Sequence, residues 1–174
     1  MKYLIPAMLL LLAACKEDQA ASQIPGPVEL TQEAAGYYCQ MVILEHQGPK
    51  AQVHLEGMFA PLWFSQVRDG IAYLKSPEQS AEILVLYVND MGRATSWSEI
   101  GEGNWIIASD AYFVIGSDAI GGMGAPEVVP FGNQADADAF ADEHGGEVMR
   151  LDDIPTEAVL GPVEFGSTAL ETSE

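Results

Sequence analysis

Cys39 and Met41 are the two side chains whose types and spacing most directly suggest chemistry in this sequence. A thiolate and a thioether are soft donors, and soft sulfur ligands select Cu(I) over hard cations. On an extended segment, residues two apart point to the same face, so both sulfur atoms could share one ion without a loop closing between them. The pair therefore indicates a soft-metal site, and Cu(I) is the ion that it fits.

Met123 is the third sulfur side chain that the sequence singles out. It stands in Gly121-Gly122-Met123-Gly124, and the flanking glycines disfavour simple core packing, so we expect its thioether to be exposed or poised over a ligand. Met58 and Met91 each follow turn-like residues and could be loop ligands or lids over the core, whereas Met149 alternates in an apolar strand and is expected inside. Because methionine commonly fills gaps in a core, each of these residues alone is also compatible with packing.

The sequence lacks the G-x-S-x-G, Walker, dinucleotide-binding and H-E-x-x-H motifs of common enzymes. A thiol-dependent enzyme with Cys39 as nucleophile would need one of the three histidines beside that thiol to activate it: His46, His54 or His144. Nothing in the sequence specifically supports such a pair, so we do not expect an enzyme. Another alternative is a metal-free interaction or assembly lipoprotein in which Cys39 is buried.

The N-terminus has the pattern of a lipoprotein leader. An apolar run of about ten residues is too short to cross roughly 30 Å of hydrocarbon, and it has the length of a signal-peptide core. It ends in Leu12-Ala13-Ala14-Cys15, which resembles the lipobox of bacterial lipoproteins. Residues 1–14 are therefore predicted to be a signal peptide, and Cys15 to carry the two or three acyl chains of a stable anchor. Because Lys16 replaces the aspartate of the inner-membrane retention signal, we expect a periplasm-facing protein at the outer membrane.

The charge balance limits the classes of partner that the protein can bind. The chain has 26 acidic and 7 basic residues, a net charge of −19 with neutral histidines. Such a surface repels nucleic acid and anionic lipid headgroups, so we expect no nucleic-acid partner. Contact with the membrane is expected only through the lipid anchor. The acidic surface would attract cations or a basic protein surface.

The elements that must position these side chains follow one order twice, strand, strand, helix, strand. Apolar runs, alternation and helical spacing predict, in residues 35–93, strands 41–44 and 51–55, a helix over 61–74 and a strand 83–88. Residues 105–155 repeat the order with strands 112–115 and 127–131, a helix capped by Asn133 and ending near His144, and a strand 147–151.

The sequence therefore predicts an α+β fold of two small ββαβ modules in tandem. A polar, glycine-containing linker at 94–104 separates the modules. Residues 15–34 are predicted to be a flexible tether, and residues 156–174 an acidic tail that is disordered or loosely docked.

Several short motifs along residues 35 to 155 resemble, in their order and spacing, the NosL family of lipoproteins. They are Tyr38-Cys39-Gln40-Met41, Gly48-Pro49-Lys50-Ala51-Gln52, Trp63-Phe64 with Val67-Arg68-Asp69, Tyr87-Val88-Asn89-Asp90-Met91-Gly92, Met123-Gly124 with Pro130-Phe131, and His144-Gly145-Gly146. Each motif is short, and the specificity lies in their combination.

The resemblance implies a monomeric Cu(I)-binding accessory protein that delivers copper for the catalytic copper–sulfide centre of nitrous oxide reductase, with that enzyme or its assembly machinery as the partner. It also implies a MerB-like fold of two ββαβ modules. Cys39 and Met41 match the Cys-x-Met of the family, and Met123 matches its loop methionine. His54 is the candidate nitrogen donor, whereas His144 is expected to cap or pack at the end of its helix.

Overall fold

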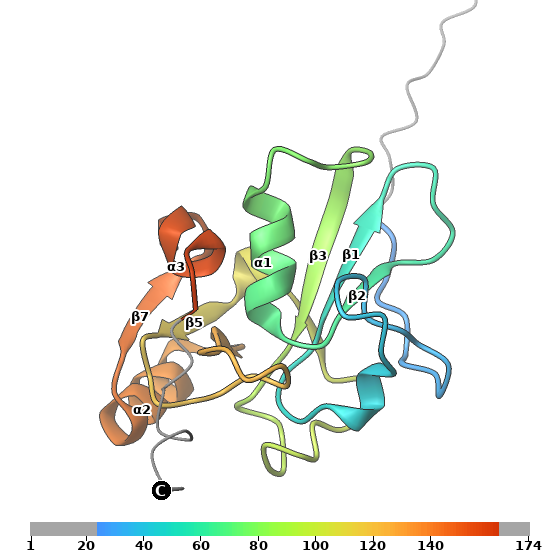
Figure 1. The fold of residues 1–174 in the computed structure, drawn as a ribbon. Coiled ribbons are helices and arrows are strands. Elements are labelled where there is room, and N and C mark those ends of the chain that lie inside the picture. Colours follow the sequence, from blue (N-terminus) through green and yellow to red (C-terminus); the bar gives the residue numbers. More distant parts are fainter. Residues whose placement is uncertain (1–23, 164–174) are drawn as a thin grey trace, which may run out of the picture.

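The computed structural model describes residues 24–163 and contains two antiparallel sheets joined by helices (Figure 1). The predicted signal peptide, the predicted lipidation site Cys15 and the end of the predicted acidic tail lie outside the described residues. Within the described part of the chain, no helix is long and apolar enough to cross a membrane.

The first sheet has the strand order β2-β1-β3-β4 and is covered by helix α1. Its elements are β1 (Ala51–Leu55), β2 (Leu62–Phe64), α1 (Val67–Lys75), β3 (Ile83–Asn89) and β4 (Trp105–Ile107). The second sheet has the order β6-β5-β7 and packs against α2. Its elements are β5 (Tyr112–Ile115), β6 (Val129–Phe131), α2 (Gln134–His144) and β7 (Glu147–Arg150).

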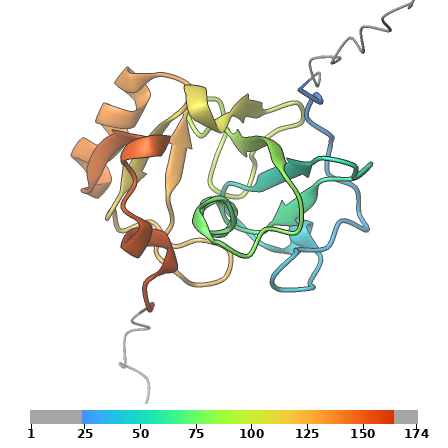
Figure 2. The same cartoon turned by 90° about the horizontal axis from the view of Figure 1, so that it is seen from above.

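The predicted repeat of strand, strand, helix, strand is confirmed, because β2-β1-β3 and β6-β5-β7 have the same order and the same antiparallel pairing. Asn133 is confirmed as the N-cap of α2, since its side-chain oxygen accepts a hydrogen bond from the backbone N–H of Asp136. In the view of Figure 2 the two sheets lie side by side, with α1 seen end-on near the middle.

In the first module the order was predicted correctly from a partly wrong set of elements. The predicted strand 41–44 is instead a short 3-10 turn, η1 (Ile43–Glu45). The second strand is β2, which the sequence assigned to the start of a helix. Pairing of Phe64 with Ala51 extends this segment, and Gln66 keeps an extended backbone before α1 begins. The aromatic pair Trp63 and Phe64 suits a half-buried sheet, a preference that the helical spacing of apolar residues concealed.

β4 is a second difference from the prediction. Trp105, which was expected to begin the second module, pairs with Asn89 and extends the first sheet instead. The Asn104 amide donates to the backbone oxygens of Asp90 and Ile100, and the Asn89 amide donates to the backbone oxygen of Asn104. These buried bonds hold the start of β4 beside the end of β3.

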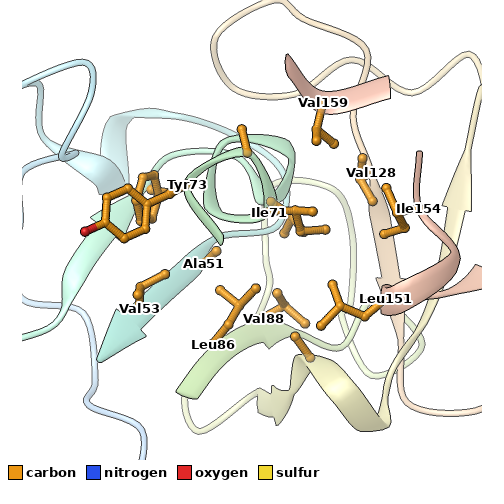
Figure 3. Packing of buried hydrophobic residues seen from close by; sticks show 14 of the residues in the cluster. Ala51, Val53, Ile71, Tyr73, Leu86, Val88, Val128, Leu151, Ile154 and Val159 are labelled. Carbon is orange, nitrogen blue, oxygen red and sulfur yellow. The ribbon is translucent and has the colours of Figure 1, made fainter. Parts of the chain in front are cut away.

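One hydrophobic core runs through both modules (Figure 3). Ile71 of α1 and Val88 of β3 point toward Leu151 and Ile154 from the other half of the chain, and all four are buried. Helix α3 (Thr156–Leu160) adds the buried Val159 to the same cluster. The modules are therefore repeats within a single packed unit.

The described ends of the chain are more tightly packed than the sequence predicted. Part of the predicted tether lies on the first sheet, because Val28 and Gln52 exchange two hydrogen bonds and the Tyr87 hydroxyl donates to the backbone oxygen of Pro25. The predicted tail begins with α3, which packs against α1. Polar composition concealed both contacts, because each depends on only a few side chains.

Candidate functional site

Cys39 lies in a tight loop that closes on itself between Ala34 and Ile43. The backbone N–H of Gly36 donates to Met41 O at 2.9 Å, and that of Ile43 donates to Ala34 O at 2.9 Å. Gln40 has a φ of 57°, in the left-handed region of backbone conformation that residues other than glycine seldom adopt. The extended segment expected between Cys39 and Met41 is therefore wrong, and the two residues are related by a turn.

The Cys39 sulfur is half-buried between the loop and the first sheet. Its Sγ atom lies 3.7 Å from Ser65 Oγ, and a Cβ atom added at Gly36 would overlap it. Glycine at position 36 therefore makes room for the sulfur. The Ser65 hydroxyl group is not a base, so this contact does not provide the activating partner that a nucleophilic thiol needs. Met41 is 42% exposed at the rim of the same loop.

The loop that carries Met123 packs against the adjacent residues Ser65 and Gln66. The backbone N–H of Met123 donates to Gln66 Oε1 at 3.2 Å. A Cβ built on Gly122 would lie 3.1 Å from the backbone oxygen of Ser65, which is a very close approach. Ser65 and Gln66 join β2 to α1. Ser65 contacts Cys39, and both residues contact the Met123 loop. The structure therefore brings Cys39 and the Met123 loop to the same connection between β2 and α1, here called the joint.

His54 is not at this joint. It follows Gln52 on the face of β1 turned away from Ala51 and Val53, which pack into the core. Its Nε2 lies 2.9 Å from Gln52 Oε1 and its ring meets Tyr87 edge-on. Burial lowers the pKa of His54, so its imidazole is held neutral within the sheet.

The imidazole that the structure does bring to the Met123 loop belongs to His46. Its Nδ1 lies 2.9 Å from the carbonyl oxygen of Gly122, which can only accept a hydrogen bond, so Nδ1 carries the proton. Nε2 is then left with a free lone pair, and it is buried without a hydrogen-bond partner. An imidazole oriented through one nitrogen by a backbone carbonyl is the usual arrangement of a metal-binding histidine. Nothing in the sequence around His46 distinguishes it from His54.

Beneath the same loop lies the carboxyl group of Glu127, which is fully buried. Its Oε1 accepts the backbone N–H groups of Arg68 and Val128, each at 2.9 Å, and so closes the N-terminus of α1. Its Oε2 has no partner and is aimed at Gly121, where an added Cβ would lie 2.7 Å away. Burial raises the pKa of Glu127 to about 8, so the group is protonated at neutral pH. The sequence did not single out this residue.

The remaining methionines and His144 lie apart from this joint. Met149 packs against the main core, as predicted. Met91 packs against a smaller apolar cluster in the second module, formed by Val114, Val129, Phe131 and Ala137. Met58 is exposed in the connection between β1 and β2. His144 ends α2, stacks on Phe140 and pairs with Asp118 at 2.9 Å, in agreement with its expected packing role.

The candidate metal donors on the loops around the joint are Cys39, Met41, Met123 and His46. Between residues 24 and 163, no group of three or more His, Cys, Asp or Glu side chains gathers in a way that could hold a metal ion. A hard cation would need several oxygen ligands, so the joint does not suit calcium or magnesium. Thiol, thioether and imidazole groups are soft or borderline donors instead, and such donors would suit a monovalent copper ion.

Comparison with known proteins agrees with this chemistry. A family model described as NosL matches residues 27–159. A copper-binding lipoprotein NosL of Achromobacter cycloclastes is 57% identical over 165 residues, covering 94% of this chain and 84% of the relative. A protein of the same description from Stutzerimonas stutzeri is 33% identical over 144 residues, covering 82% and 73%.

Two solved structures are also similar. The crystal structure of the copper chaperone NosL from Shewanella denitrificans superimposes with a TM-score of 0.69 at 29% identity, covering 75% of this chain and 96% of that one. The solution structure of the apo-NosL protein from Achromobacter cycloclastes has a TM-score of 0.50 at 58% identity, covering 67% and 94%.

Proposed function

The chain belongs to the NosL family, and from this premise we propose that it is a Cu(I)-binding chaperone whose metal site is the Cys39–Met123 joint. Cys39, Met41 and Met123 would supply a thiolate and two thioethers. The observation that supports the proposal is that the adjacent residues Ser65 and Gln66 contact Cys39 and the Met123 loop, respectively. This arrangement supports a shared site, because it brings together two loops whose soft donors are more than 80 residues apart in the chain.

His46 is the nitrogen donor that we propose in place of His54. Its Nε2 is unpartnered, and its other nitrogen is fixed by the loop that carries Met123. Movement of that loop would move His46 and Met123 together, so the site can open as a unit.

The proposed mechanism is ligand exchange, and no bond of a substrate is broken. Binding of Cu(I) displaces the proton of the Cys39 thiol, so affinity rises with pH. A thioether is a neutral donor and holds the ion less firmly than a thiolate does. Met41 is exposed at the rim of its loop, so an incoming ligand of a partner can replace it before the Cys39 bond breaks. The ion is then never released free.

The surface around Cys39 supports transfer to a protein partner. Tyr37, Tyr38 and Leu44 are all at least 40% exposed on or beside the loop. Exposed apolar side chains at a functional site favour contact with another protein. We propose that the recipient is nitrous oxide reductase or its assembly machinery, and that the acidic net charge of −19 favours a basic docking surface on it.

The chain would act as a periplasm-facing monomer held to the outer membrane by acyl chains on Cys15. The two curated relatives are described as lipoproteins, which supports the lipid anchor. Intact-mass measurement of the membrane-extracted protein tests this part separately, because acylation at Cys15 adds a defined mass.

A Cu(I) competition titration under anaerobic conditions tests the site. We expect one ion per chain, and a loss of affinity of at least tenfold for both Cys39→Ser and Met123→Ile. Met58→Ile is the matched control, because Met58 is an exposed loop methionine on another connection, and it should bind as the wild type does. Unchanged affinity of both site variants would refute the assignment. Turnover that depends on Cys39 would favour the thiol-dependent enzyme. Absence of bound copper would favour the metal-free interaction or assembly lipoprotein.

A further inference from the structure

The connection between β1 and β2 exposes apolar side chains that no packing explains. Phe59 is fully exposed and Met58 is 49% exposed, and the whole stretch 56–60 projects from the sheet. Its backbone bends at Gly57, which has a φ of 75°. Phe59 is not covered by the protein and about half of Met58 is exposed, so both side chains are available to an external apolar phase.

The described chain begins at the same end of the molecule. In Figure 1 the first blue residues lie beside the end of β1 from which this connection leaves. Ile24, the first described residue, is also exposed, at 61%. Cys15 precedes Ile24 by nine residues, a stretch that reaches at most about 30 Å. An acyl anchor on Cys15 therefore keeps this end of the protein within a short distance of the bilayer.

We propose that the tip formed by Met58 and Phe59 is a second contact with the lipid surface beside the acyl anchor. The proposal rests on the lipidation of Cys15, and it is independent of copper binding. Because the protein is strongly acidic and Glu56 adjoins the tip, the surface that it enters is zwitterionic and not anionic. Aromatic and thioether side chains suit the boundary between headgroups and acyl chains.

The contact would orient the metal site. β1 runs from Ala51 beside the joint to Leu55 beside the tip, and β2 returns from Leu62 to Phe64, directly before Ser65. The tip and the Cys39 loop therefore lie at opposite ends of the same strand pair. With the tip in lipid, the loop faces the aqueous phase, where a soluble partner can reach it.

Quenching by brominated lipid tests the contact. The full lipidated chain is reconstituted in vesicles of brominated phosphatidylcholine, and Trp is introduced by Phe59→Trp or, as the matched control, by Leu44→Trp. Leu44 is 48% exposed but lines the surface at the metal-site end. The signal of the three native tryptophans is subtracted by using the unsubstituted chain.

We expect the emission of the tryptophan at position 59 to be quenched at least twofold and the emission of the one at position 44 to be unchanged. Equal quenching at both positions would overturn the proposal, because it would indicate a tumbling domain without a preferred contact. Absence of quenching at position 59 would also overturn it. The mass of the acylated chain and the Cu(I) affinity of the Phe59→Trp variant are measured on the same samples, so failure of the lipid contact is distinguishable from failure of lipidation or of copper binding.

Discussion

Replacement of Glu127 by glutamine should raise the free energy of unfolding relative to that of the wild type, and this gain should be larger at neutral pH than at pH 5. The carboxyl group is fully buried, and its pKa is raised to about 8 chiefly by that burial, against an ordinary value of 4.5. In glutamine the amide oxygen can still accept from the backbone N–H groups of Arg68 and Val128. The substitution therefore removes the titration and keeps the geometry.

The sign and the size of this change in the free energy of unfolding follow from proton linkage. Between pH 4.5 and 8 the unfolded chain loses the Glu127 proton while the folded chain keeps it, so the free energy of unfolding falls as pH rises. One fully linked proton changes stability by about 1.4 kcal/mol per pH unit, which gives at most about 3 kcal/mol between pH 5 and 7.5. Lys50, whose pKa burial lowers to about 8, is mostly protonated in the folded protein over this range and adds slope only near its upper end.

Urea unfolding of the wild type and of Glu127→Gln, followed by circular dichroism at several pH values from 5 to 7.5, measures the effect. The stability difference between the two proteins should grow in favour of the variant by more than about 1 kcal/mol across the range. Glu143→Gln is the control, because Glu143 is exposed on α2 and its replacement should leave the slope unchanged. Parallel pH dependences of wild type and Glu127→Gln would refute the reasoning, because they would mean that Glu127 is ionised in the folded protein.

Three further predictions concern the site and the fold. His46→Asn should lower Cu(I) affinity in competition titrations by several-fold, whereas His54→Asn should not, because His54 lies on the face of β1 turned away from the core and bonds to Gln52. Gly121→Ala should reduce both Cu(I) affinity and stability, the latter by about 1–3 kcal/mol in urea unfolding, because the added methyl would overlap the Gln66 and Glu127 oxygens; a Gly26→Ala control meets nothing within 4 Å. Asn133→Ala should lower stability by about 1 kcal/mol through loss of the α2 cap, with Cu(I) affinity intact.

Local sequence signals were sufficient wherever a segment's structure depends on its own residues. β1 and β5 were predicted with their observed bounds, and Asn133 was identified as a cap because a side chain with an acceptor oxygen precedes the helix. Repetition of the element order indicated the duplicated architecture for the same reason.

The errors in strand assignment around β2 and β4 lie where partners outside the segment decide. The helical spacing of apolar residues that starts at Trp63 predicted a helix, but Trp63 and Phe64 form a strand because Gln52 and Ala51 pair with them. Trp105 joins the first sheet because Asn89 is placed beside it. Pairing with residues that lie more than ten positions away leaves no periodic signal in either segment.

The sequence by itself determined which atoms can bind a soft ion, because the sulfur atoms of Cys39, Met41 and Met123 are properties of residue type and composition. The tertiary structure alone decided which imidazole lies against the Met123 loop. His46 and His54 are chemically identical, and only the fold places one ring on the Gly122 carbonyl and the other on Gln52. It also placed Glu127 beneath the loop, since burial of a carboxyl group depends on the residues that the fold packs around it.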